Sequence, residues 1–284
     1  MYYYIFEPTK NPKELKVQDE IKVKLQTLGI VGESVTLSLA EEPRDLARVG
    51  LRKNYSTIVA CGSDRLINEV GSGLIESGAV LGAIPLKENS AFHAILGTTN
   101  YLEACDILPQ RKVLTIDCGL INSSKIFITE VTVKPKKELS LSDSGLIIVN
   151  FDGDFQAETK LCDIIVSNAG AGEKDLPAGR QDTEKIRKLL IDNHLDVFIP
   201  DQLKDQGGFF SRLFGKKENA SETVNGGSIF HPQRISIESR KKLITLLSDK
   251  IIERGNLVIE SYPGSLKIII KRERPQIEEE ENNE

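Results

Sequence analysis

The sequence is poor in the residues that mark several classes of protein. Its 284 residues include no tryptophan, one methionine, three histidines and four cysteines. The cysteines lie far apart and form no Cys-x-x-Cys pair, which argues against a disulfide framework or a zinc site and favours reduced thiols in the core of a cytoplasmic protein. The histidines show no metal-ligand spacing, so we expect no histidine-based metal site.

Long apolar runs and an excess of positive charge are also missing. No apolar run approaches the ~18–20 residues that span a bilayer, and residues 1–8 lack the basic region and cleavage site of a signal peptide. The net charge is −5, which argues against a nucleic-acid partner. With 39% hydrophobic and 28% charged residues, the composition is that of a soluble globular protein.

Strands and helices alternate through the first part of the chain. Strands are expected at residues 2–6, 34–39, 56–60 and 80–85, and helices at 15–28, 43–49, 66–77 and 89–96. Such alternation is typical of a parallel sheet covered by helices on both faces. Residues 1–110 are therefore predicted to form an α/β domain.

The pattern changes near residue 110. Short apolar segments then follow one another at 112–121, 125–134, 145–150, 157–167, 195–199, 234–238, 243–247, 257–262 and 266–271. Many short strands separated by turn signals are typical of an antiparallel sandwich or barrel. Residues 111–273 are therefore predicted to form a β domain, with one helix in 179–191 and a mobile loop at 204–228. An acidic, disordered tail is expected at 274–284.

The most informative segment connects a buried strand to a helix. The apolar strand 56–60 is followed by a turn with Gly62 and Asp64, and then by helical spacing. A strand, a glycine turn that carries a carboxylate and a helix are the usual phosphate site of an α/β fold. Ser63 and Arg65, however, stand where a phosphate cradle favours glycine. Whether the chain has this fold and whether its turn still binds a phosphate are therefore separate questions.

Five motifs occur in order along the chain, at 64–70, 81–86 with Phe92, 116–119 with 127–129, 192–197 and 262–267. In this order and spacing they resemble the diacylglycerol-kinase catalytic family. That family includes the soluble bacterial lipid kinases and the sphingosine and ceramide kinases, and it is related in fold to NAD kinase. The first two motifs are similar to its Gly-Gly-Asp-Gly-Thr-x-Asn-Glu-Val and Leu-Gly-x-x-Pro-x-Gly-Thr-Gly-Asn-Asp-Phe. The last two are similar to its Asp-Gly-x-Leu-Asp-Val and its closing Pro-Gly-Ala-Leu strand.

The resemblance implies an NAD-kinase-like three-layer α/β domain that holds ATP, and a C-terminal antiparallel β-sandwich domain that completes a lipid site. The implied activity is transfer of the γ-phosphate of ATP to a lipid hydroxyl, such as that of diacylglycerol. Phosphoryl transfer needs positioning and charge neutralisation, so the implied cofactors are ATP and Mg²⁺.

The resemblance also implies candidate site residues. The catalytic candidates are Asp249, near the position of the family's proposed general base, and Asp64. The candidate metal ligands are Asp192 and Asp196. The candidate nucleotide-binding residues follow the two loops of the first domain and are Gly62, Ser63, Asp64, Asn68, Glu69, Lys87 and Asn89.

The chain departs from the family pattern at the phosphate positions. In the first loop Ser63, Arg65 and Leu66 replace Gly, Gly and Thr, and in the second loop residues 87–91 replace Gly-Thr-Gly-Asn-Asp. Glu7 replaces an asparagine, which adds a negative charge. Each lost contact to phosphate costs about 1.5–3 kcal/mol, and several together about 10³-fold in affinity or rate.

We therefore expect a lipid-kinase-family protein with weakened or lost catalysis and a residual lipid- or nucleotide-binding role. One alternative is an active lipid kinase with rearranged phosphate loops, and another is a non-catalytic interaction protein. In the last case Asp64 only caps a helix, Asn68 and Glu69 lie on a solvated helix face, and Arg65 and Lys87 are solvated loop charges.

One segment indicates weak, transient membrane contact. Residues 207–217 combine aromatic side chains with cations: Phe209, Phe210, Arg212, Phe214, Lys216 and Lys217. Such a patch can insert rings into a bilayer interface while its cations meet anionic headgroups. The alternative is that the phenylalanines pack on the β domain.

Overall fold

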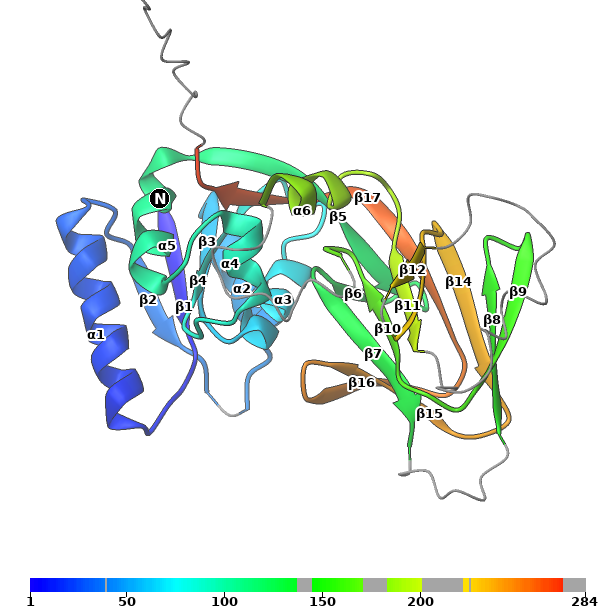
Figure 1. Cartoon of the computed structure of the whole chain (residues 1–284). Coiled ribbons are helices and arrows are strands. Elements are labelled where there is room, and N and C mark those ends of the chain that lie inside the picture. Colours follow the sequence, from blue (N-terminus) through cyan, green and yellow to red (C-terminus); the bar gives the residue numbers. More distant parts are fainter. Residues whose placement is uncertain (39, 137–144, 171–182, 201–221, 225, 273–284) are drawn as a thin grey trace, which may run out of the picture.

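Two hydrophobic cores organise the chain. The structure is a computed structural model that describes residues 1–38, 40–136, 145–170, 183–200, 222–224 and 226–272 (Figure 1). One core lies around a parallel sheet with helices, at the left of Figure 1, and the other lies between two antiparallel layers at the right. The predicted fold class, α/β followed by an antiparallel sandwich, is confirmed.

The first part has parallel strands in the order β2-β1-β3-β4. Its strands are β1 (Tyr2–Phe6), β2 (Glu33–Thr36), β3 (Thr57–Gly62) and β4 (Val80–Pro85). Its helices are α1 (Pro12–Thr27), α2 (Pro43–Arg52), α3 (Asp64–Ser72), α4 (Ala91–Leu96) and α5 (Tyr101–Ile107). Alternate side chains of β1 meet opposite layers: Tyr3 packs against Gly50 of α2, whereas the Tyr4 hydroxyl donates to the carbonyl of Ile30, just after α1. Because both faces are covered, β1 and β3 are fully buried apolar runs.

Two long strands, β5 (Lys112–Ile121) and β17 (Leu257–Ile270), connect the parts. They pair antiparallel, and the end of β17 also pairs parallel with β4. The prediction of two strands at 257–262 and 266–271 was wrong, because β17 continues through a register shift between Tyr262 and Leu266. The C-terminal half of β17 therefore lies in the core of the first part, whereas Leu257 and Ile259 at its start lie in the second core. The predicted boundary at residue 110 falls just before β5 and stays a prediction.

The second part is a sandwich. Its separate antiparallel sheet has the order β12-β13-β11-β10-β7-β15-β16, and it faces β14, β8 and β9 of the first sheet across the second core. The strands are β6 (Lys125–Phe127), β7 (Glu130–Pro135), β8 (Leu146–Phe151), β9 (Phe155–Lys160), β10 (Ile164–Ser167), β11 (Asp196–Pro200), β12 (Glu222–Val224), β13 (Gly227–Phe230), β14 (Arg234–Ser239), β15 (Leu243–Leu247) and β16 (Lys250–Arg254). Helix α6 (Thr183–Leu189) packs beside α4.

Several expectations needed correction. The segments 125–134 and 157–167 each form two strands, β6 with β7 and β9 with β10. Helix α5 and strand β16 were not predicted. The end of the loop expected at 204–228 contains β12 and the start of β13. Residues 207–217, with the aromatic and basic side chains singled out above, and the tail 274–284 lie outside the described residues. Among the described helices, none has the length and apolar character to cross a bilayer.

Candidate functional site

The turn between β3 and α3 has the predicted strand–turn–helix geometry. Gly62 is the last residue of β3, and Ser63 is the N-cap of α3. The Ser63 hydroxyl accepts a hydrogen bond from the Leu66 N–H at 3.4 Å, as N-cap serines do. The backbone N–H groups at such a helix start favour an anion.

A carboxylate of the chain itself binds at this turn. Glu7 follows β1, and its carboxylate accepts the Ser63 N–H at 2.6 Å and the Ser63 hydroxyl at 2.8 Å. The Arg65 guanidinium lies 3.9 Å from the same carboxylate. The Gln18 side-chain amide donates to the Glu7 carbonyl at 2.7 Å and holds its backbone in place. A Cβ atom at Gly62 would lie 2.7 Å from a carboxylate oxygen of Glu7, so only glycine leaves room for this contact.

Asp64 connects the two predicted phosphate loops. Its carboxylate accepts the Ser90 hydroxyl at 2.5 Å and the Ala91 N–H at 3.1 Å. Ser90 is the N-cap of α4, and its hydroxyl accepts the Phe92 N–H at 3.2 Å. Both carboxylate oxygens of Asp64 therefore accept hydrogen bonds at the start of α4, so Asp64 helps to cap the helix that follows the second loop.

The remaining residues of the second loop face solvent. Lys87 and Asn89 are exposed, and the Lys87 carbonyl accepts the Ser90 N–H at 3.2 Å in a tight turn. Within the described part of the chain, neither side chain has a hydrogen-bond or ion-pair partner. The structure thus brings Lys87 and Asn89 close to Asp64 through Ser90, and their proposed contacts to a nucleotide stay predictions.

Asn68 is buried between the two parts of the chain. Its side chain is 1% exposed, so the alternative of a solvated helix face was wrong for this residue. Its amide oxygen accepts the Ile128 N–H at 2.7 Å and, more weakly, the Thr129 N–H at 3.4 Å. Its amide nitrogen donates to the Asp64 carbonyl at 2.8 Å and to the Thr129 hydroxyl at 3.2 Å. Asn68 therefore fixes α3 to the turn between β6 and β7.

A second asparagine also forms hydrogen bonds with this turn. Asn168, at the end of β10, donates its backbone N–H to the Thr129 carbonyl at 2.8 Å and its side-chain amide to the Asp117 carbonyl at 2.7 Å. No residue pattern in the sequence singled out Asn168. Its partners are 39 to 51 positions earlier in the chain, and only the folded sheet brings them together.

Glu69 faces the second part of the chain. The Lys250 ammonium lies 3.0 Å from the Glu69 carboxylate and 3.3 Å from that of Glu42. Burial disfavours the charge on Lys250, but the carboxylates outweigh it and raise the pKa of the ammonium. The catalytic candidate Asp249 is exposed at the tip of the β15–β16 hairpin, one residue before this ion pair. The hairpin therefore reaches α3, as a shared site requires, while the role of Asp249 stays a prediction.

The two candidate metal ligands have separate partners. Asp196 is 6% exposed, and its carboxylate lies 2.6 Å from Nδ1 of His231. The Asp192 carboxylate accepts the His194 N–H at 2.8 Å, and burial raises the pKa of Asp192. Among the residues that the structure describes, no group of three or more His, Cys, Asp or Glu side chains could hold a metal ion.

Asp117, which the sequence named only as part of the motif 116–119, is a buried acid that connects two segments of this region. Asp117 is 4% exposed, and its two carboxylate oxygens accept the Asn193 N–H at 2.8 Å and the Gly264 N–H at 2.7 Å. It thereby attaches the 192–196 turn to the irregular middle of β17.

Low pH should lower the free energy of unfolding through His93, which lies in α4 after the second loop. This side chain is buried in α4 with Nδ1 2.9 Å from the Thr98 hydroxyl, and burial lowers its pKa, partly opposed by the Asp64 charge. Below about pH 6.5 the unfolded chain binds a proton that the folded chain does not, so stability falls as pH falls. Urea unfolding at about pH 7.5 and 5.5 should show a smaller drop in H93Q than in the wild type. Equal drops would contradict this.

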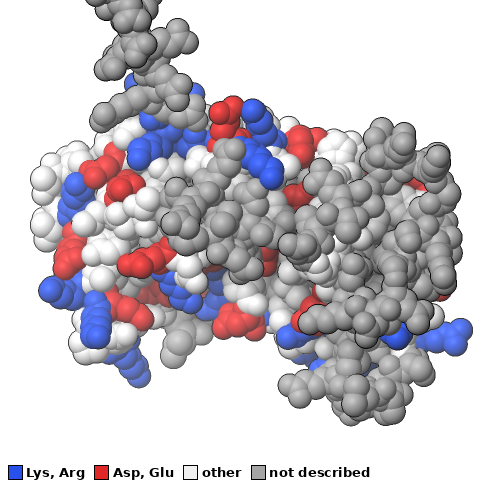
Figure 2. Space-filling model, viewed as in Figure 1, with Lys and Arg blue, Asp and Glu red and all other residues white. Residues whose placement is uncertain are grey.

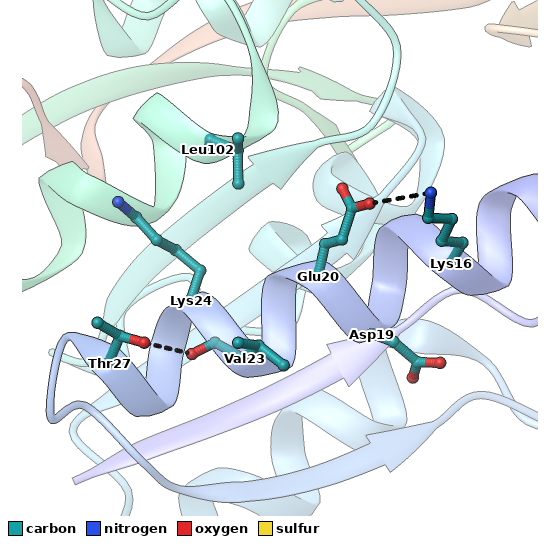
Figure 3. Close-up of a pocket in the computed structure, with 7 residues that line it drawn as sticks. All are labelled: Lys16, Asp19, Glu20, Val23, Lys24, Thr27 and Leu102. Atoms are coloured by element: carbon teal, nitrogen blue, oxygen red, sulfur yellow. Dashed lines mark hydrogen bonds and ion pairs between the residues drawn. The ribbon is translucent and has the colours of Figure 1, made fainter.

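A groove of about 510 Å³ lies elsewhere, on the outer side of α1. Figure 3 shows the α1 side chains that line it, together with Leu102 of α5. None of the predicted site residues lines this groove, so it lends no support to the nucleotide site.

The chain resembles known bacterial lipid kinases. No family model matches it. Diacylglycerol kinase of Staphylococcus carnosus is 25% identical over 218 residues, covering 66% of this chain and 71% of that enzyme. Diacylglycerol kinase of Staphylococcus saprophyticus is 27% identical over 124 residues, 42% of this chain and 40% of that enzyme. The predicted resemblance is confirmed.

Solved structures show the same fold. A diacylglycerol kinase from Bacillus anthracis superimposes with a TM-score of 0.68 at 20% identity, covering 95% of this chain and 96% of that one. Two further chains from that organism give TM-scores of 0.68 and 0.69 at 18% and 17% identity. Both parts of the present chain are therefore arranged as in these structures.

Proposed function

We propose that this chain is a lipid-kinase-fold protein whose phosphate site is filled by its own side chains, so that ATP-dependent phosphorylation of a lipid hydroxyl is weak or lost and a lipid-binding role remains. The observation that carries the proposal is the Glu7 carboxylate on the N–H and hydroxyl of Ser63. The named relatives are diacylglycerol kinases, which makes a lipid the favoured ligand class.

Glu7 competes with phosphate in two ways. Its carboxylate uses the N–H at the start of α3, where an anion is favoured, and its negative charge repels a second anion. A phosphate group would have to break two hydrogen bonds to a charged acceptor, each of about 1.5–3 kcal/mol. The sum corresponds to a loss of about 10²–10⁴-fold in phosphate affinity.

Glu69, the carboxylate of the family motif that could hold a metal ion, also has a partner within the protein. Glu69 persists from the family motif, but the Lys250 ammonium already lies between Glu69 and Glu42. Mg²⁺ brought by ATP would have to compete with this ammonium for the same carboxylate. The residues present therefore fit ATP and Mg²⁺ poorly, and we assign no reaction step to either.

One observation favours the alternative of an active kinase with rearranged loops. Arg65 and Lys87 are both cations on the two loops that Asp64 joins, and Lys87 is exposed. If Glu7 moved away, these cations could meet phosphate oxygens in place of the missing glycine N–H groups.

Calorimetric titration with ATP and Mg²⁺ tests the proposal. The wild type should show no micromolar binding, whereas E7N, which removes the charge and shortens the side chain, should bind ATP at least about tenfold more tightly. The matched control is E20N, which makes the same charge change on the outer side of α1. A parallel assay follows radiolabelled phosphate from ATP into diacylglycerol.

Two results would overturn the proposal. One is micromolar ATP binding by the wild type together with turnover on diacylglycerol. The other is an E7N variant that keeps the wild-type unfolding temperature but binds ATP no better than E20N, because Glu7 then does not block the site.

A further inference from the structure

The β15–β16 hairpin contacts the first part of the chain through its tip, residues 246–251. Lys250, the first residue of β16, places its ammonium 3.0 Å from the Glu69 carboxylate of α3 and 3.3 Å from that of Glu42, the N-cap residue of α2. Figure 1 shows β16 extending from the sandwich toward the first part, and in that area of Figure 2 acidic and basic side chains lie next to one another. One ammonium thus joins the hairpin to the starts of two helices.

A β-bulge separates the tip from the rest of the hairpin. The register of the β15–β16 ladder shifts between Thr245 and Leu246, and Ile252 is the extra residue on β16. A bulge bends its strand and interrupts the ladder. The Thr245 side chain is fully buried, and its hydroxyl has no hydrogen-bond partner among the described residues. With two ladder pairs left beyond it, the bulge is a weak point at which the tip can separate from the base.

The base of the hairpin, residues 243–245 and 252–254, is attached separately. The Lys125 ammonium of β6 donates to the Ile252 carbonyl and lies 3.0 Å from the Glu253 carboxylate. The Ile252 side chain also packs against the second core. These contacts hold the base to the sandwich whether or not Lys250 stays with its carboxylates, so the tip can move while the base remains in place.

We propose that the tip is a strap that closes over α3 and is released when Lys250 loses its two carboxylates. The Glu69 side chain is 13% exposed and that of Lys250 is 38% exposed. Because one partner is this exposed, salt weakens the contact and keeps it reversible. Release would open Glu69, the acid of the α3 motif, to solvent. This inference goes beyond the proposed function, since it concerns access to α3 and does not require that ATP be excluded.

Hydrogen–deuterium exchange of the full chain without nucleotide, followed by mass spectrometry, tests the proposal. At low salt the amides of the tip should exchange about fivefold faster in K250M than in the wild type, because methionine keeps an aliphatic side chain and removes the charge. Raising the salt concentration from about 0.02 M to about 0.5 M should speed the wild-type tip by a similar factor and leave K250M unchanged. K250R keeps the charge and should exchange like the wild type.

The matched control is K160M, which makes the same change at an exposed position of β9, on the far edge of the other sheet. It should leave exchange at the tip unchanged. Equal exchange at the tip of K250M and K160M would overturn the proposal, as would a wild-type tip that exchanges as fast as an unstructured peptide. Faster exchange of β17 together with the tip in K250M would also overturn it, because the loss would then be global. With ATP absent, the result is independent of whether Glu7 blocks a phosphate.

Discussion

Replacing Asn68 with alanine is expected to lower the free energy of unfolding by about 3 kcal/mol. The amide is buried, and its removal leaves the Ile128 N–H and the Thr129 hydroxyl without the partner that it supplies. Each buried polar group left unpaired costs about 1–3 kcal/mol. Because these partners belong to the β6–β7 turn, the loss should loosen α3 from the second part of the chain. Urea unfolding followed by circular dichroism measures the effect.

Ser72→Ala is the matched control for Asn68→Ala. Ser72 lies on the same helix, and its hydroxyl donates only to the carbonyl of Glu69 within the helix, at 2.7 Å. This variant should lose less than about 1 kcal/mol. If Asn68 instead serves mainly to hold a nucleotide, Asn68→Ala will unfold like Ser72→Ala and differ from the wild type only in ligand binding.

Replacing Asp64 with alanine is expected to cost about 2–3 kcal/mol in the free energy of unfolding. Two hydrogen bonds to a charged acceptor disappear, and the start of α4 loses the carboxylate that holds Ser90 and Ala91. Because we propose that the Glu7 contact leaves the wild type with little affinity for ATP, the variant should change stability and leave ATP binding unchanged. Thermal unfolding and ATP titration measure the two quantities on the same sample.

A double-mutant cycle separates the Asp64–Ser90 contact from general damage. Ser90→Ala removes the hydroxyl that donates to Asp64 at 2.5 Å. The two single variants each lose unfolding free energy, and the sum of these losses should exceed the loss in the double variant by at least about 1 kcal/mol. The reason is that both substitutions remove the same hydrogen bond. Additive losses would show that the two side chains act independently. A loss of kinase turnover in Asp64→Ala without a loss of stability would restore Asp64 as a catalytic residue.

Local patterns predicted much of the fold. The strands β1, β4 and β5 were predicted with the bounds that the structure has, because each is an apolar run ended by a turn signal. Two strands were predicted at 257–262 and 266–271, on either side of the turn signal Pro263-Gly264, yet β17 continues through these two residues as an irregularity. Here pairing with β5 on both sides of the break outweighs the local turn preference.

The candidate site was predicted only in outline. The sequence placed Gly62, Ser63 and Asp64 on one turn, and the resemblance marked Glu7, after the first strand, as an added negative charge. The partners themselves are remote: Glu7 and Ser63 are 56 positions apart, and Glu69 and Lys250 are 181 apart. The alternative of a solvated helix face was wrong for Asn68, which is 1% exposed. A helix pattern does not reveal which later segment of the chain will cover one of its faces.

The sequence by itself determined the two-part fold, the order of most strands and the loss of glycines from both phosphate loops, because these follow from neighbours a few residues apart. Only the tertiary structure decided which charges meet. The parallel sheet places the ends of β1 and β3 side by side, which brings Glu7 to the start of α3, and the β15–β16 hairpin brings Lys250 to Glu69. Charged and polar groups attract strongly only at short range, so the internal contacts that we propose compete with phosphate and metal form only when the whole chain is folded.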